Sequence, residues 1–310
     1  MTRIGTSELD VRPLSLGGNV FGWTADSTTS HRVLDAFLDG GGDFIDTADV
    51  YSAWSDGGAG ISETYIGEWF AASGKRDQVV LATKVAMAPG LEGLAADTIR
   101  KAVDASLTRL QTDHIDLYWA HADDAATPME ETLGAFDELV RAGKVRALGA
   151  SNFTGPRLQQ ALETSRREGF ASYVALQNQY SLVEREDYEQ GPADVVAANG
   201  LAAIPYSALA SGFLTGKYRP GKLADSQRQA TAAAYLDTPK GEKVLDALDA
   251  VAAAHSVEVG SVALAWLTAQ PTVVAPIASA RTPEQLPVLL AALDLELTSE
   301  EIAELERASR

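Results

Sequence analysis

The stretch that decides the fold is residues 115–149, which read IDLYWAHADDAATPMEETLGAFDELVRAGKVRALG. It opens with an apolar run of strand length, Ile115–Trp119, and closes with another, Val145–Gly149. Between the two runs, apolar residues recur at the helical spacing, at Leu133, Phe136, Leu139 and Val140. Gly143 stands where that helix should end. The stretch therefore predicts a strand, a helix and a second strand, the unit from which parallel sheets are built.

The same unit recurs along the chain. Strands are expected at Leu14–Leu16, Phe44–Asp46, Val79–Thr83, Ile115–Trp119, Val145–Gly149, Tyr173–Gln177, Ala202–Pro205 and Val273–Ile277. Helices are expected at Thr29–Asp39, Glu63–Ala72, Asp97–Leu110, Met129–Ala142, Arg157–Arg167, Asp187–Ala198, Gly241–Ala254, Gly260–Ala269 and Pro283–Ala292. Strands and helices in this number and order predict an α/β fold, a (β/α)₈ TIM barrel formed as a single domain by residues 1–310.

A doubly wound open sheet is the main alternative to the barrel. Such a sheet normally carries a G-x-G-x-x-G turn after its first strand, and GGNVFG at residues 17–22 matches that pattern poorly. Two additions to the barrel are also expected. Thr2–Asp10 forms an N-terminal β-hairpin over the barrel floor, and Thr298–Arg310 forms an extra C-terminal helix with Ser299 as its N-cap.

The charge of the chain excludes some partners. Asp and Glu number 43 and Lys and Arg 25, for a net charge of −18. Nucleic acids and anionic membranes both need a positive surface, so neither is expected as a partner. An anionic ligand would need a concentrated local positive site. The chain has no cysteine, and its first residues lack the apolar core of a signal peptide, so a cytoplasmic location is expected.

Chemistry-bearing side chains gather at the ends of three consecutive predicted strands. Asp46 ends the second strand, Lys84 follows the third and His121 follows the fourth, while Tyr51 lies in the loop after Asp46. The carboxyl ends of the strands in such a barrel meet at one rim, where active sites are built. These four side chains are therefore expected to converge. No spacing of histidines or carboxylates indicates a metal site.

Three segments resemble the aldo-keto reductase family, in its bacterial and potassium-channel-β-like branch, and the resemblance covers essentially the whole chain. They are GDFIDTADVY at 42–51, GKVRALGASNF at 143–153 and ALASGFLTGK at 208–217. The resemblance implies a catalytic tetrad of Asp46, Tyr51, Lys84 and His121. A carbonyl that receives a hydride needs a proton as charge develops on its oxygen. Tyr51 is expected to donate it, with a pKa lowered by Lys84. Asp46 would hold Lys84, and His121 would bind the substrate oxygen.

The resemblance also implies a nicotinamide cofactor, NADPH (NADP⁺). Its 2′-phosphate and adenine would be held by Ser279, Arg281 and Gln285 beside a helix N-terminus. The diphosphate would lie on the loop after the seventh strand, held by Ser207, Leu209, Gly212, Leu214, Gly216 and Lys217. The nicotinamide would contact Ser151, Asn152, Gln177 and Tyr206. Two positions depart from the family pattern, since Ala278 replaces a glycine and Leu289 replaces an asparagine that contacts adenine.

The expected activity is reduction of aldehydes or ketones to alcohols, with a small-molecule carbonyl as the partner. Trp23 and Trp54 are expected to bind substrate together with His121, and Trp119 either joins them or lies in the barrel core. Two other functions share this machinery: a cofactor-binding regulatory subunit like the channel β-subunits, and a sugar or polyol dehydrogenase working in the oxidative direction. The sequence specifies neither the substrate nor the oligomeric state.

Overall fold

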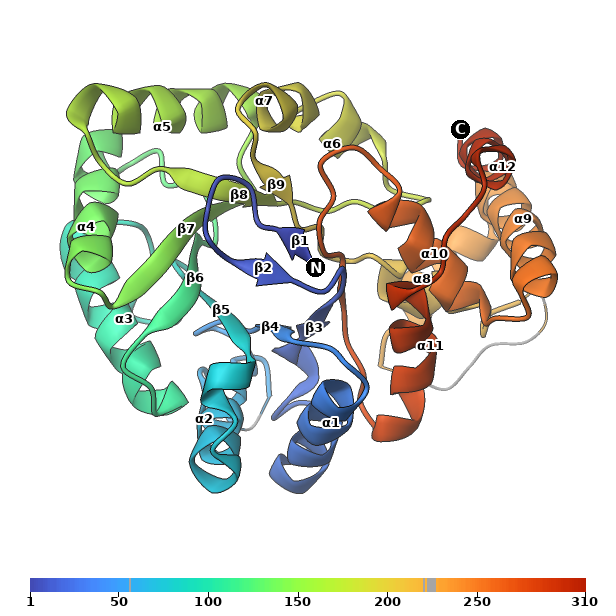
Figure 1. Ribbon diagram of the computed structural model, residues 1–310, viewed down its shortest axis with the longest axis horizontal. Coiled ribbons are helices and arrows are strands. Elements are labelled where there is room, and N and C mark those ends of the chain that lie inside the picture. The colour runs from blue at the N-terminus through green and yellow to red at the C-terminus, as the bar shows by residue number, and fades with distance from the viewer. Residues whose placement is uncertain (56, 220, 222–226) are drawn as a thin grey trace.

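The computed structural model describes residues 1–55, 57–219, 221 and 227–310. Its main sheet holds eight parallel strands arranged as a barrel, as the sequence predicts (Figure 1). They are β3 (Ser15–Gly17), β4 (Phe44–Asp46), β5 (Val80–Val85), β6 (Ile115–Ala120), β7 (Val145–Ser151), β8 (Tyr173–Gln177), β9 (Ala202–Ala203) and β10 (Ile277–Ala278). Neighbours in sequence are neighbours in the sheet, and β10 pairs with β3.

The barrel closes between β9 and the chain that leads into β10. Val274 N–H donates to the carbonyl of Ala203 at 2.9 Å, and Ile277 N–H donates to the carbonyl of Pro205 at 2.8 Å. The predicted strand Val273–Ile277 therefore lies in the barrel wall, although regular pairing with β3 begins only at its last residue.

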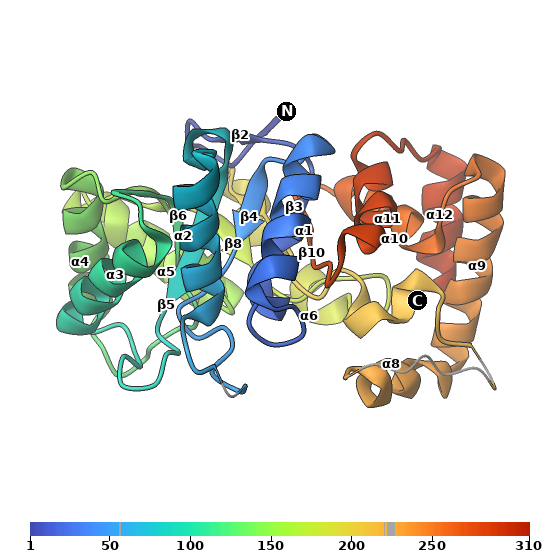
Figure 2. The same cartoon turned by 90° about the horizontal axis from the view of Figure 1, so that it is seen from below.

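The helices surround the barrel as Figures 1 and 2 show. They are α1 (Ser27–Asp39), α2 (Ile61–Ser73), α3 (Ala96–Leu110), α4 (Met129–Arg141), α5 (Gly155–Glu168), α6 (Glu186–Glu189), α7 (Ala193–Ala198), α8 (Gln229–Leu236), α9 (Pro239–His255), α10 (Val259–Thr268), α11 (Leu286–Leu290) and α12 (Ser299–Ala308). Short 3₁₀ turns are η1 (Gly18–Val20), η2 (Arg76–Gln78), η3 (Ala210–Thr215), η4 (Pro283–Gln285) and η5 (Ala291–Leu293).

Two predicted helices differ in detail, and one helix of the structure was not predicted. The helix expected at Asp187–Ala198 is broken into α6 and α7 on either side of Gly191 and Pro192, because proline has no N–H for the ladder. The helix expected at Pro283–Ala292 is a short α-helix between two 3₁₀ turns. Helix α8 was not expected at all.

The N-cap of the C-terminal helix lies one residue earlier than predicted. Thr298, and not Ser299, is the N-cap of α12. Its hydroxyl accepts a hydrogen bond from the Glu301 N–H at 3.3 Å, and the Glu301 carboxylate accepts one from the Thr298 N–H at 2.8 Å. This reciprocal pair is a capping box, which needs a serine or threonine three residues before the glutamate, and Thr298 has that spacing from Glu301.

Both faces of the barrel wall are buried, which explains why its strands are apolar at nearly every position. In β6, Leu117 and Trp119 point into the barrel, while Ile115 and Tyr118 pack in the layer beneath the helices. The Trp119 ring lies over Gly149 of β7, where a Cβ atom would be 2.2 Å from it. Trp119 is therefore a barrel core residue.

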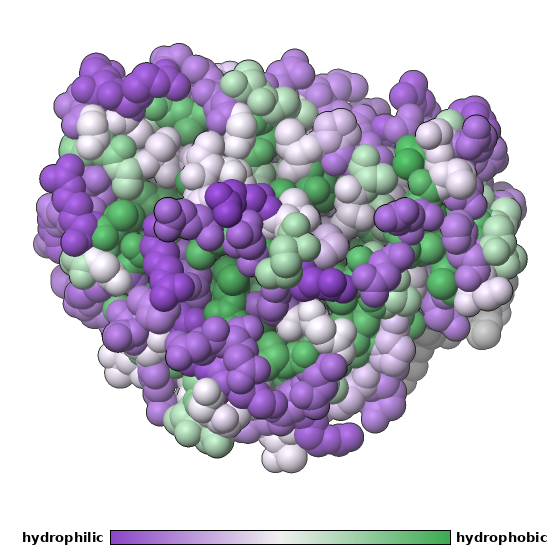
Figure 3. All heavy atoms as spheres, in the orientation of Figure 1, coloured by the Kyte–Doolittle hydropathy of each residue, from purple (hydrophilic) through white to green (hydrophobic). Residues whose placement is uncertain are grey.

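The N-terminal hairpin, β1 (Thr2–Arg3) paired with β2 (Asp10–Val11), forms as predicted. It crosses one end of the barrel, and α8 lies toward the opposite end (Figure 2). Ile4 and Val11 pack against the barrel interior and close the end of the barrel that the hairpin crosses. Hydrophilic side chains form most of the rim of this face (Figure 3). Within the described chain no single helix is long and apolar enough to cross a membrane; α9 and α10 reach that length only together, across a 96° bend.

Candidate active site

Lys84 is the centre of a buried hydrogen-bond network at the carboxyl ends of β4 and β5. Its ammonium donates to the carboxylate of Asp46, to the carbonyl of Thr47 at 2.7 Å and to the hydroxyl of Tyr51 at 3.1 Å. Lys84 and Asp46 are both fully buried. Asp46 also accepts a hydrogen bond from the side-chain amide of Gln177 at 3.0 Å. The ion pair thus fixes the cation directly beside the phenol.

The charges of this network act on Tyr51 in opposite directions. Burial raises the pKa of Tyr51 above its ordinary value, the Lys84 ammonium lowers it, and the Asp46 carboxylate raises it again. The effect of Lys84 has the expected sign, but burial outweighs it and the net shift is upward. Burial would also lower the pKa of Lys84, but the negative charges of Asp46 and Tyr51 outweigh burial and raise it. Lys84 is therefore a cation at neutral pH, and Tyr51 is a neutral phenol.

His121 lies beside Tyr51 at the end of β6, with the two ring centroids 6.2 Å apart. Burial, aided by the positive charge of Lys84, lowers the pKa of His121 well below its ordinary value, so the imidazole is neutral. Hydrogen bonds hold the backbone of His121 at both its N–H and its carbonyl. The His121 N–H donates to the carbonyl of Val85, and the His121 carbonyl accepts a hydrogen bond from the Asn152 amide, each at 2.9 Å.

One cavity of about 690 Å³ contains most of the predicted site. The predicted residues that line it are Trp23, Tyr51, Trp54, His121, Ser151, Asn152, Gln177, Tyr206, Ser207, Leu209, Gly212, Lys217, Ser279, Arg281 and Gln285. Asp46 and Lys84 lie behind its wall, in contact with Tyr51. Leu214 is buried, and neither Leu214 nor Gly216 is among the described residues that line the cavity. The cavity therefore joins the tetrad end to the predicted phosphate end.

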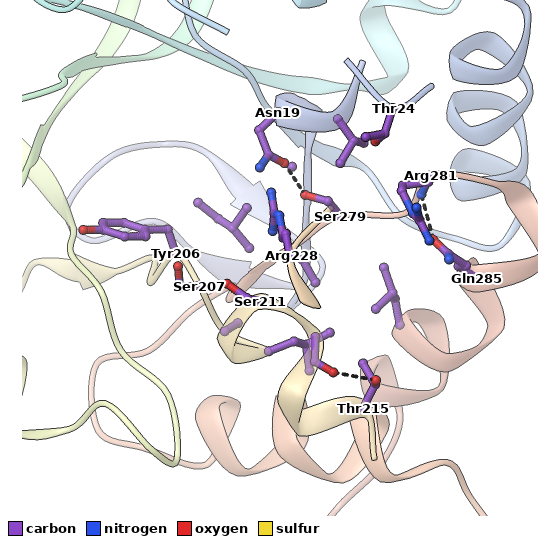
Figure 4. A pocket seen from close by; sticks show the side chains of 18 of the residues that line it. Asn19, Thr24, Tyr206, Ser207, Ser211, Thr215, Arg228, Ser279, Arg281 and Gln285 are labelled. Atoms are coloured by element: carbon purple, nitrogen blue, oxygen red, sulfur yellow. Dashed lines mark hydrogen bonds between the residues drawn. The ribbon is translucent and has the colours of Figure 1, made fainter. Parts of the chain in front are cut away.

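The phosphate end presents the Arg281 guanidinium and the Gln285 amide as donors, and the carboxylates of Glu258 and Glu284 also line the cavity. Arg281 and Gln285 lie side by side there, with Tyr206 at the other end and Arg228 between (Figure 4). The Arg281 N–H donates to the Gln285 side-chain carbonyl at 2.8 Å, which leaves the Gln285 amide N–H groups as donors. In the described chain the guanidinium of Arg281 forms no ion pair. This end can therefore hold an anion such as a phosphate group.

The loop after β9 has the backbone of a phosphate cradle. Ser207, Ala210 and Ser211 have positive φ angles of 56°, 45° and 57°, and Gly212 has one of 90°. A Cβ atom on Gly212 would lie 3.0 Å from the Lys217 ammonium. The small side chains of this tight turn let a ligand approach the backbone, although the Ala210 and Gly212 N–H groups already donate to the carbonyls of Ser207 and Leu209, each at 2.8 Å. The residues present thus fit a diphosphate-containing cofactor.

Aromatic rings surround Tyr51 at the cavity mouth. The Trp54 ring contacts Tyr51 and Trp23 edge to face, with centroids 6.1 and 5.9 Å apart. Trp54 is 51% exposed, which is unusual for so large an apolar side chain. Asp56, in the loop that carries Trp54, lies outside the described residues.

Three residues near the site were not singled out from the sequence. Arg228 lines the cavity with its guanidinium 5.5 Å from the Trp23 ring centre. Asn19 also lines it and accepts a hydrogen bond from the Ser279 hydroxyl at 2.6 Å, so Ser279 must rotate to donate to a phosphate. Asp49 is only 1% exposed, and neither of its carboxylate oxygens has a partner in the described structure. No spacing rule marks Arg228 or Asn19, whereas Asp49 lies within the GDFIDTADVY segment.

The sequence model of the aldo/keto reductase family matches residues 13–310. The uncharacterized oxidoreductase YrpG of Bacillus subtilis is 38% identical, with 96% of this chain and 92% of that protein covered. The norsolorinic acid reductase stcV of Emericella nidulans is 34% identical, with 96% and 78% covered. The aryl-alcohol dehydrogenase GME11368 of Pestalotiopsis microspora is 32% identical, with 97% and 80% covered.

Proposed function

This chain belongs to the aldo/keto reductase family, and we propose that it is an NADPH-dependent oxidoreductase that reduces aldehyde or ketone carbonyls to alcohols with Tyr51 as the proton donor. The observation that carries the proposal is the contact of 3.1 Å between the Lys84 ammonium and the Tyr51 hydroxyl at the wall of a cavity. A phenol in contact with a fixed cation is a proton donor whose conjugate base is stabilised.

The bound cofactor would supply the hydride. A substrate carbonyl between Tyr51 and His121 would then meet two hydrogen-bonding groups. As negative charge develops on its oxygen, Tyr51 transfers the phenolic proton to that oxygen, and Lys84 stabilises the phenolate left behind. Neutral His121 can orient the oxygen with its single ring N–H, and it lacks the acidic second proton of an imidazolium, which would compete with that of Tyr51. Asp46 and Gln177 keep Lys84 and its ion pair in place.

The preference for NADPH over NADH is supported by the Arg281 end of the cavity. The net charge of −18 opposes the binding of any phosphate-rich molecule, so a local cation must compensate. Arg281 presents a planar fork that suits two phosphate oxygens, with the Gln285 amide beside it. The aromatic rings at the opposite end favour an aromatic or apolar carbonyl as the substrate.

The same groups also serve the reverse reaction, and one of the relatives is named an aryl-alcohol dehydrogenase. In that direction Tyr51 as phenolate would accept the alcohol proton. The test is a panel of aliphatic and aromatic aldehydes, 4-nitrobenzaldehyde among them, with matched alcohols, measured with NADPH, NADH and their oxidised forms. Reduction of aldehydes with NADPH is the expected result. Turnover of alcohols alone would favour the dehydrogenase, and cofactor binding without any turnover would favour a regulatory subunit.

A further inference from the structure

We propose that the carboxylate of Glu258 accepts a hydrogen bond from the exocyclic amino group of the cofactor's adenine, and that this contact makes the site specific for adenine over hypoxanthine. The inference rests on the proposed binding of NADPH. If the 2′-phosphate lies at Arg281, the adenine must lie within one ribose of it, because both are attached to the same sugar.

The wall of the cavity beside Arg281 is built by the starts of α10 and α11. The Ser261 hydroxyl of α10 donates to the carbonyl of Val288 in α11 at 2.6 Å. A Cβ atom on Gly260 would lie 3.0 Å from the Val288 side chain. Glu258 immediately precedes α10 and lines the cavity together with Val288 and Leu289. The carboxylate therefore stands at the edge of an apolar wall on which a base can lie.

Other polar side chains at this end already have a hydrogen-bond or charge partner, although the hydroxyl and amide oxygens among them each keep a free lone pair. The side-chain carbonyl of Gln285 accepts the Arg281 N–H at 2.8 Å. The Thr215 hydroxyl donates to the carbonyl of Gly212 at 2.7 Å. Glu284 lies with its carboxylate 3.8 Å from the Arg32 guanidinium, and its side chain is 73% exposed.

Glu258 is exposed, as Glu284 is, but it differs from these groups in its contacts. It is the N-cap of α10, yet its side chain forms no capping hydrogen bond, and within the described structure its carboxylate has no ion-pair partner. Val288 and Leu289 offer no polar atom in their side chains. An amino group on the base that lies against them would find its acceptor in Glu258. The 6-oxo group of hypoxanthine would instead face a negative charge.

The experiment compares the dissociation constants of NADPH and of reduced nicotinamide hypoxanthine dinucleotide phosphate, each titrated by quenching of protein fluorescence. Both cofactors carry the same phosphates, so repulsion between Glu258 and phosphate cancels in the ratio of the two constants. Wild type should prefer NADPH by roughly tenfold, the usual effect of a hydrogen bond to a charged group.

Glu258→Ala should bring the ratio close to one, because it removes both the acceptor and the charge. Glu258→Gln should also lower the ratio, since its amide can accept from an amino group or donate to an oxo group. Glu284→Ala is the matched control and should keep the wild-type ratio. Thermal melting of each variant checks that it is folded.

A ratio near one in wild type, or one unchanged in both Glu258 variants, would overturn the inference. An equal loss of affinity for both cofactors in Glu258→Ala would also overturn the inference, because Glu258 would then contact a group that the two cofactors share. Failure of the proposed cofactor is distinguishable, since wild type would then bind neither dinucleotide. Failure of the proposed reduction is distinguishable as well, since it would abolish turnover and leave the ratio of the two dissociation constants unchanged.

Discussion

The Lys84 ammonium lies 3.1 Å from the Tyr51 hydroxyl, and its two other hydrogen bonds go to Asp46 and to the Thr47 carbonyl. A lysine ammonium has three N–H donors, so all of them are used. The cation cannot turn away from the phenol without leaving a buried carboxylate or carbonyl unpaired. The rigidity of this arrangement is the basis of the first two predictions.

Tyr51→Phe should lower kcat by about two to four decades, the usual contribution of a positioned proton donor. Binding of NADPH should be unchanged, because the ring that borders the cavity is kept. Steady-state rates with an active aldehyde and titration of NADPH by fluorescence quenching measure the two quantities. Near-normal kcat would show that the proton comes from another group.

Lys84→Met should lose most activity, and the pH profile of its kcat should move to higher pH. Lys84 lowers the pKa of Tyr51, so its removal lets burial raise that pKa further. Reduction needs the protonated phenol and alcohol oxidation needs the phenolate, so the rising limb of the oxidation profile should move to higher pH. Asp46→Asn should also lower activity, but less severely, because it removes only the partner of Lys84. Since the Asp46 carboxylate raises the pKa of Tyr51, this variant should move the rising limb of the oxidation profile to lower pH.

The check is a pH profile of kcat in both directions, with circular dichroism to confirm folding, because Lys84→Met leaves a buried carboxylate unpaired. An unchanged profile in a folded Lys84→Met variant would refute the coupling.

Arg281→Ala should weaken NADPH binding by roughly one to two decades while NADH binding changes little, because a charge-assisted hydrogen bond contributes about 1.5–3 kcal/mol. Lys217→Ala is the matched control. Lys217 lies over the cradle near Gly212, where the shared diphosphate is expected, so its loss should weaken both cofactors alike. Equal losses for NADPH and NADH in Arg281→Ala would show that Arg281 does not read the 2′-phosphate.

Asp49→Asn should make stability less dependent on pH. Burial, aided by the charge of Glu63, raises the pKa of Asp49 to about 7, whereas its ordinary value is 3.8. The folded state therefore holds a proton that the unfolded state releases. The contribution of Asp49 to the free energy of unfolding of the wild type is therefore fully present at pH values below the unfolded pKa. It is lost as the pH rises toward 7.

The difference between these two pKa values of Asp49 corresponds to about 4 kcal/mol of unfolding free energy. Urea unfolding of both proteins between pH 4 and 8 should show Asp49→Asn gaining on wild type by up to that amount. A difference in unfolding free energy that stays constant across this range would contradict the prediction.

Much of the fold could be predicted because its signals are local. Each strand of the barrel was located from an apolar run a few residues long, and the helices between them from their apolar spacing. The predicted ends of helices were wrong where a specific contact or a helix-breaking residue determined them. Thr298 replaced Ser299 as the cap because Glu301 completes the box, and Gly191 and Pro192 ended α6 inside a continuous helical pattern.

The convergence of Asp46, Tyr51, Lys84 and His121 was determined by the sequence alone. Parallel strands in a barrel end at one rim, so residues that follow consecutive strands must lie together there. The tertiary structure decided the rest. Gln177 donates to Asp46 across 131 residues, and Arg228 enters the cavity, because the paths of loops and the packing beneath them set those contacts. The direction in which the pKa of Tyr51 shifts also depends on the folded structure, because burial raises it and the Lys84 charge lowers it. The depth of burial and the distance between the charges are set by the fold and cannot be derived from the sequence.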